Sequence, residues 1–203
     1  MNRKRSQAQR TVWAHKRMLA VAEEALKSQR KIAQAKTWYP DRCGDIIHRM
    51  QSVSDMNEWQ CSVILAATSA NTRWQDNVRR AIQAAEYIGG RDVPFPSGPP
   101  YHVDNILWAG ANPKRDPERM LTGRKTSNFA RAIYGDETAV TVDLWMCMAA
   151  QIKNRNGKPV TNPGRGGHYD VVEDAIVHVS GDIEMSPRDT QALIWIQVRG
   201  SAD

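Results

Sequence analysis

Residues 121–148 constrain the chain most, because they place a lysine and an aspartate at the starts of two consecutive predicted helices. Gly123 precedes a run with apolar residues at helical spacing, namely Phe129, Ala130, Ala132 and Ile133. After a short extended stretch, Asp143 is placed to cap a second apolar helix over residues 144–152. The stretch therefore predicts two helices, with Lys125 in the first turn of one and Asp143 at the start of the other. We expect these two side chains to converge on one cleft.

These residues resemble a known family. Gly123-Arg124-Lys125-Thr126-x-Asn128, followed by Val142-Asp143, is similar to the core of the helix-hairpin-helix DNA glycosylases, endonuclease III in particular. The resemblance covers about residues 55–150. It implies an all-α, two-lobed helix-hairpin-helix DNA glycosylase-like fold with a cleft between the lobes. In that fold Lys125 is the nucleophile and Asp143 is the catalytic carboxylate.

Both residues also have a purely structural interpretation. A lysine in a first helical turn can be only a solvated charge. Asp143 can be only an N-cap, which alone stabilises a helix by about 1 kcal/mol. Their combination at this separation favours the catalytic interpretation over the structural one.

The chemistry that the resemblance implies is base excision from double-stranded DNA. The enzyme flips its target nucleotide out of the stack, at a cost of a few kcal/mol. Lys125 attacks C1′ as a neutral amine, and the resulting Schiff base permits strand cleavage at the abasic site. Two alternatives remain open: a non-catalytic DNA-binding protein on the same scaffold, and an enzyme that modifies bases in phage DNA. Trp145 stands where endonuclease III has a histidine, so the sequence does not define the target base.

A basic patch surrounds the first of these helix starts. The helix N-terminus offers free main-chain amides that can bind phosphate. The family hairpin reads Leu-Pro-Gly-Val-Gly, and only its second glycine, Gly123, is present here. The predicted DNA contacts in this region are Arg115, Arg119, Thr122, Gly123, Arg124 and Thr126.

Asn71 follows the most apolar stretch of the chain, at the end of Ser69-Ala70-Asn71. In endonuclease III the corresponding glutamine enters the base stack, so the resemblance implies a DNA contact for Asn71. As an alternative, asparagine at such a position only forms a turn.

Composition supports an anionic partner and a cytoplasmic protein. The net charge of +6 and the pI near 9.4 are typical of nucleic-acid binding. The three cysteines are too far apart for a disulfide framework, a zinc site or the iron–sulfur loop of endonuclease III, so we expect no metal and no cofactor. No apolar run approaches membrane-spanning length, and we expect no membrane contact. We expect a monomer in the cytoplasm, that of the host cell if a phage encodes the chain, as features such as Ser186-Pro187 and Gln191-Ala192-x-x-Trp195 suggest.

The predicted domain organisation is a basic N-terminal helix over residues 1–36 and a glycosylase-like domain over 37–203, with its hairpin and catalytic core at about 113–150. The N-terminal helix lies along the DNA backbone, docks through one apolar stripe, or forms a frayed separate arm. Trp38-Tyr39-Pro40 predicts a break in the helix. Asp55 is the expected cap of the next apolar helix. Further predicted helices cover residues 41–50, 56–70, 74–88, 103–110, 113–120, 168–179 and 190–198. Ser186-Pro187-Arg188-Asp189 predicts the start of the last of these, with Ser186 as its cap and Pro187 at its first position.

Overall fold

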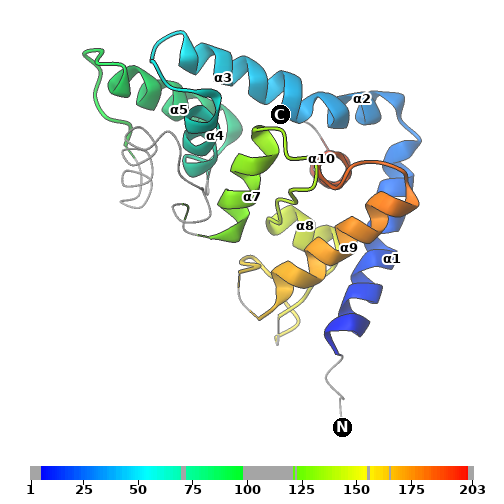
Figure 1. The fold of residues 1–203 in the computed structure, drawn as a ribbon. Helices are drawn as coiled ribbons and strands as arrows, with labels where there is room; N and C mark the ends of the chain where they lie inside the picture. The colour runs from blue at the N-terminus through cyan, green and yellow to red at the C-terminus, as the bar shows by residue number, and fades with distance from the viewer. Residues whose placement is uncertain are drawn as a thin grey trace. The chain divides into compact units, whose positions relative to one another are not determined.

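The computed structural model describes residues 6–69, 72–97, 121, 123–154, 156–164 and 166–200 of the 203-residue chain. Every regular element in these ranges is a helix, and their only strand-like pairing is an isolated bridge between Lys153 and Pro159 (Figure 1). The all-α prediction is therefore confirmed for the described residues. None of the helices in these ranges has the length and hydropathy needed to cross a membrane.

Contacts within the chain define two compact units. Unit 1 combines residues 1–38 with residues 137–202, and unit 2 comprises residues 39–136. Unit 1 is thus built from both ends of the sequence. The predicted division into residues 1–36 and 37–203 differs from this one, because the N-terminal helices pack with the C-terminal helices.

Unit 1 contains α1 (Gln7–Leu26), α2 (Gln29–Thr37), α8 (Leu144–Ala149), α9 (His168–Asp182) and α10 (Pro187–Arg199). α1 packs against α9 and α10, and α2 packs against α10. Ala14, Met18 and Ala22 recur every four residues on α1 and are fully buried in the core of unit 1. Small alanine side chains at two of these three positions let α1 lie close to its neighbours. The stripe of α1 is therefore part of this core.

The predicted single N-terminal helix is two helices. α1 ends at Leu26, and Ser28 is the N-cap of α2, its Oγ accepting a hydrogen bond from the Lys31 amide at 3.4 Å. Ser28 has an extended backbone, as an N-cap residue requires. This interruption lies within a basic, helix-favouring stretch, where the composition had indicated continuity.

The predicted break at Trp38-Tyr39-Pro40 is wrong, since the chain stays helical there as a π-helix, Trp38–Cys43. Proline lacks an amide proton, and its ring conflicts with the preceding α-helical turn. A π-helical turn has a wider hydrogen-bonding pattern, from residue i to i+5, and accommodates Pro40 without ending the helix. α3 (Gly44–Gln51) follows directly.

Unit 2 contains α3, α4 (Glu58–Ala67), α5 (Trp74–Ile88) and α7 (Arg124–Ile133). α4 contacts all three of the others, and its residues 60–67 are buried without interruption. Asn57 caps α4 in a capping box with Gln60, so the predicted cap at Asp55 is wrong. Glutamine three residues after the cap can return a hydrogen bond to the cap backbone, which selects Asn57. The helices predicted over 103–110 and 113–120 lie outside the described residues.

Candidate catalytic and DNA-contact residues

The N-terminus of α7 is formed by Gly123, as the sequence predicts. Its φ of 113° and ψ of 137° are a backbone conformation that side chains other than glycine rarely adopt. Its carbonyl accepts hydrogen bonds from the amides of Thr126 at 3.1 Å and Ser127 at 3.2 Å, which starts the helix. Glycine has no side chain, so Gly123 provides no side-chain cap for the first turn.

Lys125 is the second residue of α7 and is half-buried. Within the described part of the chain, its amine makes no hydrogen bond or ion pair. The next residues, 127–130, are buried, because α7 packs against α4. The Phe129 ring also meets the Tyr39 ring edge-on, with centroids 6.2 Å apart. This packing fixes the rotation of α7 about its axis and hence the face on which Lys125 lies.

Asp143 is the N-cap of α8, as the sequence predicts. Its Oδ1 accepts a hydrogen bond from the Met146 amide at 3.0 Å, and its side chain is half-buried. One turn later, burial and then the negative charge of Asp143 raise the pKa of the Cys147 thiol to about 12. The start of α8 therefore carries the Asp143 carboxylate, and one turn later the Cys147 thiol is protonated and unreactive.

The extended segment before Asp143 is held by Tyr169, which sequence reasoning did not identify. The Tyr169 hydroxyl, on α9, donates a hydrogen bond to the Val140 carbonyl at 2.8 Å. The same oxygen accepts one from the Val142 amide at 3.3 Å. Tyr169 is 5% exposed, so these bonds are shielded from water. One hydroxyl thus fixes the backbone up to the residue before Asp143.

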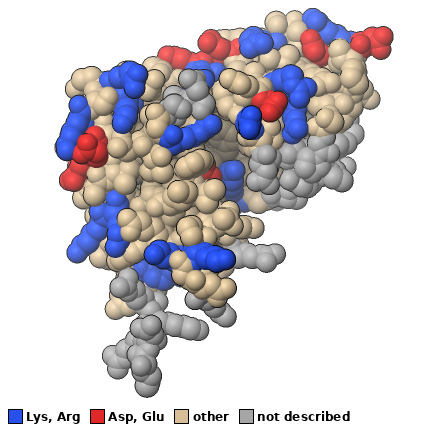
Figure 2. Space-filling model, turned by 180° about the vertical axis from the view of Figure 1, so that it is seen from behind, with Lys and Arg blue, Asp and Glu red and all other residues tan. Residues whose placement is uncertain are grey.

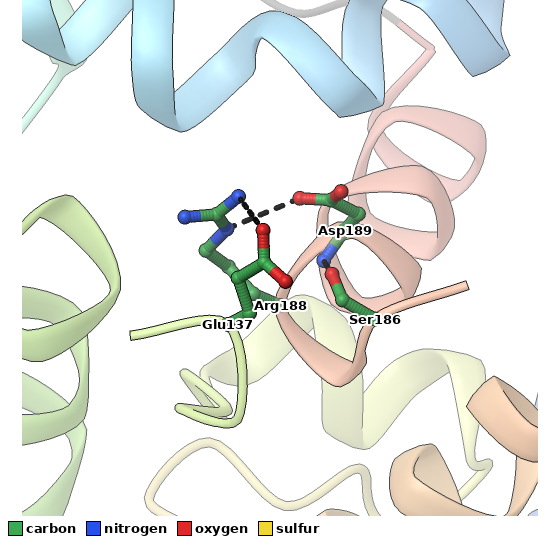
Figure 3. A network of polar contacts seen from close by, with 4 residues as sticks. All are labelled: Glu137, Ser186, Arg188 and Asp189. Atoms are coloured by element: carbon green, nitrogen blue, oxygen red, sulfur yellow. Dashed lines mark hydrogen bonds and ion pairs between the residues drawn. The ribbon is translucent and has the colours of Figure 1, made fainter. Parts of the chain in front are cut away.

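A second anchor lies at the beginning of the same segment (Figure 3). The Arg188 amide donates to the Glu137 carbonyl at 3.0 Å, and the Arg188 guanidinium contacts Glu137 Oε1 at 3.5 Å and Asp189 Oδ1 at 3.1 Å. The Arg188 side chain is only 8% exposed. Ser186 caps the same helix, α10, by accepting from the Asp189 amide at 3.1 Å. The segment from Glu137 to Val142 is therefore fixed at both ends by side chains from α9 and α10.

The predicted site residues fall into three groups. Gly123, Arg124, Lys125 and Thr126 share the first turn of α7 in unit 2. Asp143 belongs to unit 1. The predicted DNA contacts at Asn71, Arg115, Arg119 and Thr122 lie outside the described residues.

The sequence profile of DUF7178, described as a family of unknown function, matches residues 1–202. The chain belongs to this family. The match spans both units and includes the starts of α7 and α8. No curated protein and no solved structure shows significant similarity to the chain.

The cysteines and histidines of the described region show no grouping for metal binding. No cluster of three or more potential metal ligands occurs among the residues with described positions. Cys43, Cys61 and Cys147 are buried and form no disulfide bond among the described residues. Burial, together with the charge of Glu58, raises the pKa of Cys61 to about 12. Cys61 and Cys147, with their raised pKa values, are therefore poor nucleophiles near neutral pH.

Proposed function

We propose that this protein is a DNA glycosylase with abasic-site lyase activity, which excises a modified or damaged base through a Schiff base on Lys125. One observation carries the proposal: the Gly123–Asn128 motif starts α7, and Asp143 starts α8. Both positions are those that the resemblance to endonuclease III implies for the nucleophile and the carboxylate.

The local geometry of α7 supports a role in binding and attack. The first turn of α7, which has no side-chain cap at Gly123 and carries the exposed Arg124, suits a DNA phosphate. Lys125 lies in the same turn and is half-buried. A phosphate bound at the helix start would position the sugar of a neighbouring nucleotide for attack by this amine.

In the proposed reaction, Lys125 displaces the base from the sugar. The Lys125 amine forms a bond to C1′ while the bond from C1′ to the base breaks, and the base leaves with the electron pair and takes up a proton. Loss of a proton from the attacking nitrogen and opening of the sugar give the Schiff base, which permits elimination at C3′ and strand cleavage. Asp143 stabilises the positive charge that develops on the sugar.

Within unit 1, the backbone around Asp143 is held firmly. The anchors at Tyr169 and Arg188 fix the segment that ends at Asp143. A carboxylate that acts on a transition state needs such positioning, because small displacements lower the rate strongly.

The decisive experiment is covalent trapping. Borohydride reduces a Schiff base to a stable adduct, so wild-type protein incubated with a duplex containing an abasic site should give a cross-linked complex. Lys125→Ala should give none while retaining most of its affinity for the duplex, since it loses one contact among several. Lys36→Ala, which removes an exposed lysine of α2, is the matched control and should be trapped like the wild type.

Trapping that survives in Lys125→Ala would reject the assignment of the nucleophile. Wild-type protein that binds duplexes but is never trapped would instead be a non-catalytic DNA-binding protein. A screen of duplexes that carry different base lesions would then identify the target base of an active enzyme.

A further inference from the structure

Beside its buried stripe, α1 has a second face that lines a groove. Trp13, Arg17 and Glu24, at helical spacing, line a groove of about 580 Å³ together with Lys16 and two glutamines, Gln151 and Gln197. Ala20 and Val21 complete its apolar wall. All of these residues belong to unit 1, so the groove lies within a single unit.

The Arg17 guanidinium is held in place within this groove. Its Cζ lies 4.0 Å from the centroid of the Trp13 ring, a cation–π arrangement. Its Nη1 donates to Gln151 Oε1 at 2.5 Å. Its Nε is buried and has no hydrogen-bond partner among the described residues. A planar guanidinium fixed in this way is preorganised to bind an anion at low entropic cost.

Gln151, which holds Arg17, has an unusual backbone conformation. Its φ of 51° is left-handed, and it is one of only two non-glycine residues with positive φ among those described. Such a conformation is strained for a residue with a side chain and occurs often at functional sites. Here it follows the last turn of α8 and places the glutamine whose side chain holds Arg17.

The charge of the groove is positive overall. Lys16 and Arg17 contribute cations, while the one acid, Glu24, pairs with Lys27 at 2.5 Å. At Gln197 the groove adjoins Lys31, whose Nζ donates to Gln197 Oε1 at 2.6 Å. Figure 2 shows several groups of lysine and arginine side chains at the left of that view, on the side where α1 lies, with an acidic group among them.

We propose that this groove binds the phosphodiester backbone of a DNA strand, with a phosphate against Arg17 and Lys16 and the adjoining sugar against Trp13 and Val21. Guanidinium and ammonium groups bind phosphate, and the apolar wall provides surface for the uncharged part of a nucleotide. The net charge of +6 favours a nucleic acid over a basic or neutral partner. The inference concerns binding by unit 1 and does not require base excision.

The test is the salt dependence of affinity for a fluorescein-labelled DNA duplex, measured by anisotropy with the full-length protein. Arg17→Gln should weaken binding several-fold at low salt. It should also reduce the magnitude of the slope of log K, where K is the association constant, against log salt concentration by about one, because one phosphate contact is lost. Arg17→Lys should fall between Arg17→Gln and wild type, because it keeps the charge but loses the planar fork.

Arg199→Gln is the matched control. It removes the same charge from another arginine above a tryptophan, Trp195, at 4.6 Å, and neither of these residues lines the groove. It should reduce affinity less than Arg17→Gln does. Circular dichroism and thermal unfolding check that each variant is folded.

Three outcomes would overturn the proposal. They are equal effects of Arg17→Gln and Arg199→Gln, wild-type behaviour of Arg17→Lys, and displacement of labelled DNA by polyglutamate as readily as by unlabelled DNA of equal charge. The last outcome would assign the groove to an acidic peptide. Because Lys125→Ala leaves this groove intact, failure of the glycosylase proposal and failure of the groove proposal are distinguishable.

Discussion

At Asp143, capping of α8 and the proposed chemistry can be separated by a single substitution. Asp143→Asn should fold with unchanged stability, since asparagine caps a helix as well as aspartate does. It should excise the base slower by orders of magnitude, because the charge that stabilises the cationic sugar contributes several kcal/mol. Single-turnover excision and thermal unfolding measure the two effects.

Asp143→Ala is the control for Asp143→Asn. It should excise the base slowly as well, and it should also lose about 1 kcal/mol of stability because the cap is gone. If Asp143→Asn cleaves at the wild-type rate, Asp143 is a structural cap and has no part in the chemistry.

We expect His168 to lower the free energy of unfolding in acid. Its Nδ1 lies 2.6 Å from Arg10 Nη2, and burial and then the Arg10 charge lower the pKa of His168 from 6.5. A group with a lowered pKa in the folded state binds fewer protons there than in the unfolded chain. Its stabilising contribution is therefore present above pH 6.5 and is lost as the pH falls from 6.5 through the lowered value.

Urea unfolding at about pH 7.5 and about pH 5 tests this, since histidine titrates between these values. His168→Gln should lose less stability between the two pH values than the wild type does. An equal loss in both proteins would show that other groups account for the acid sensitivity.

At the scale of elements, the hydroxyl of Tyr169 connects α9 to the segment before α8. Tyr169→Phe should lower the free energy of unfolding by about 1–3 kcal/mol, because it leaves the buried Val140 carbonyl and Val142 amide without this partner. It should also slow excision while leaving DNA affinity unchanged, because Asp143 is then less well positioned. Urea unfolding and single-turnover rates measure both.

Tyr134→Phe is the matched control, since Tyr134 is 52% exposed and its hydroxyl can bond to water. It should change neither stability nor rate appreciably. A Tyr169→Phe protein that is less stable but excises at the wild-type rate would limit Tyr169 to a structural role.

Local signals in the sequence were enough to locate several helices. α5 has the predicted bounds, Trp74–Ile88, because its amphipathic pattern ends at two glycines. The Ser186-Pro187 start of α10 and the Asp143 start of α8 also follow from capping chemistry between residues at most three apart. These signals placed both catalytic candidates correctly within their own helices.

Long-range contacts were not predictable in the same way. The Tyr169 hydroxyl bonds to backbone 27 and 29 residues away, and Arg188 pairs with Glu137, 51 residues away. No periodicity relates such positions, so both anchors of the Asp143 segment were missed. The π-helix at Trp38–Cys43 was missed for a related reason, since the local preference of proline predicts a break.

At the scale of the whole molecule, α1 is part of a core rather than a separate arm. Met18→Ala should lower the free energy of unfolding by about 2–5 kcal/mol, because Met18 is fully buried in unit 1. Val12→Ala on the same helix should change it by less than about 0.5 kcal/mol, since Val12 is 56% exposed. Chemical denaturation measures both, and equal effects would indicate that α1 is only loosely attached.

The discontinuous unit 1 also has a consequence for synthesis on the ribosome. Roughly 100 residues, all of unit 2, are translated between the two halves of unit 1, which takes about 5–20 s at roughly 5–20 residues per second. Unit 2 is complete in that interval and can fold, whereas the apolar stripe of α1 must wait for α9 and α10. The nascent chain therefore carries the apolar stripe of α1 uncovered for seconds, and a transcript truncated after unit 2 would leave that stripe permanently exposed to chaperones and proteases.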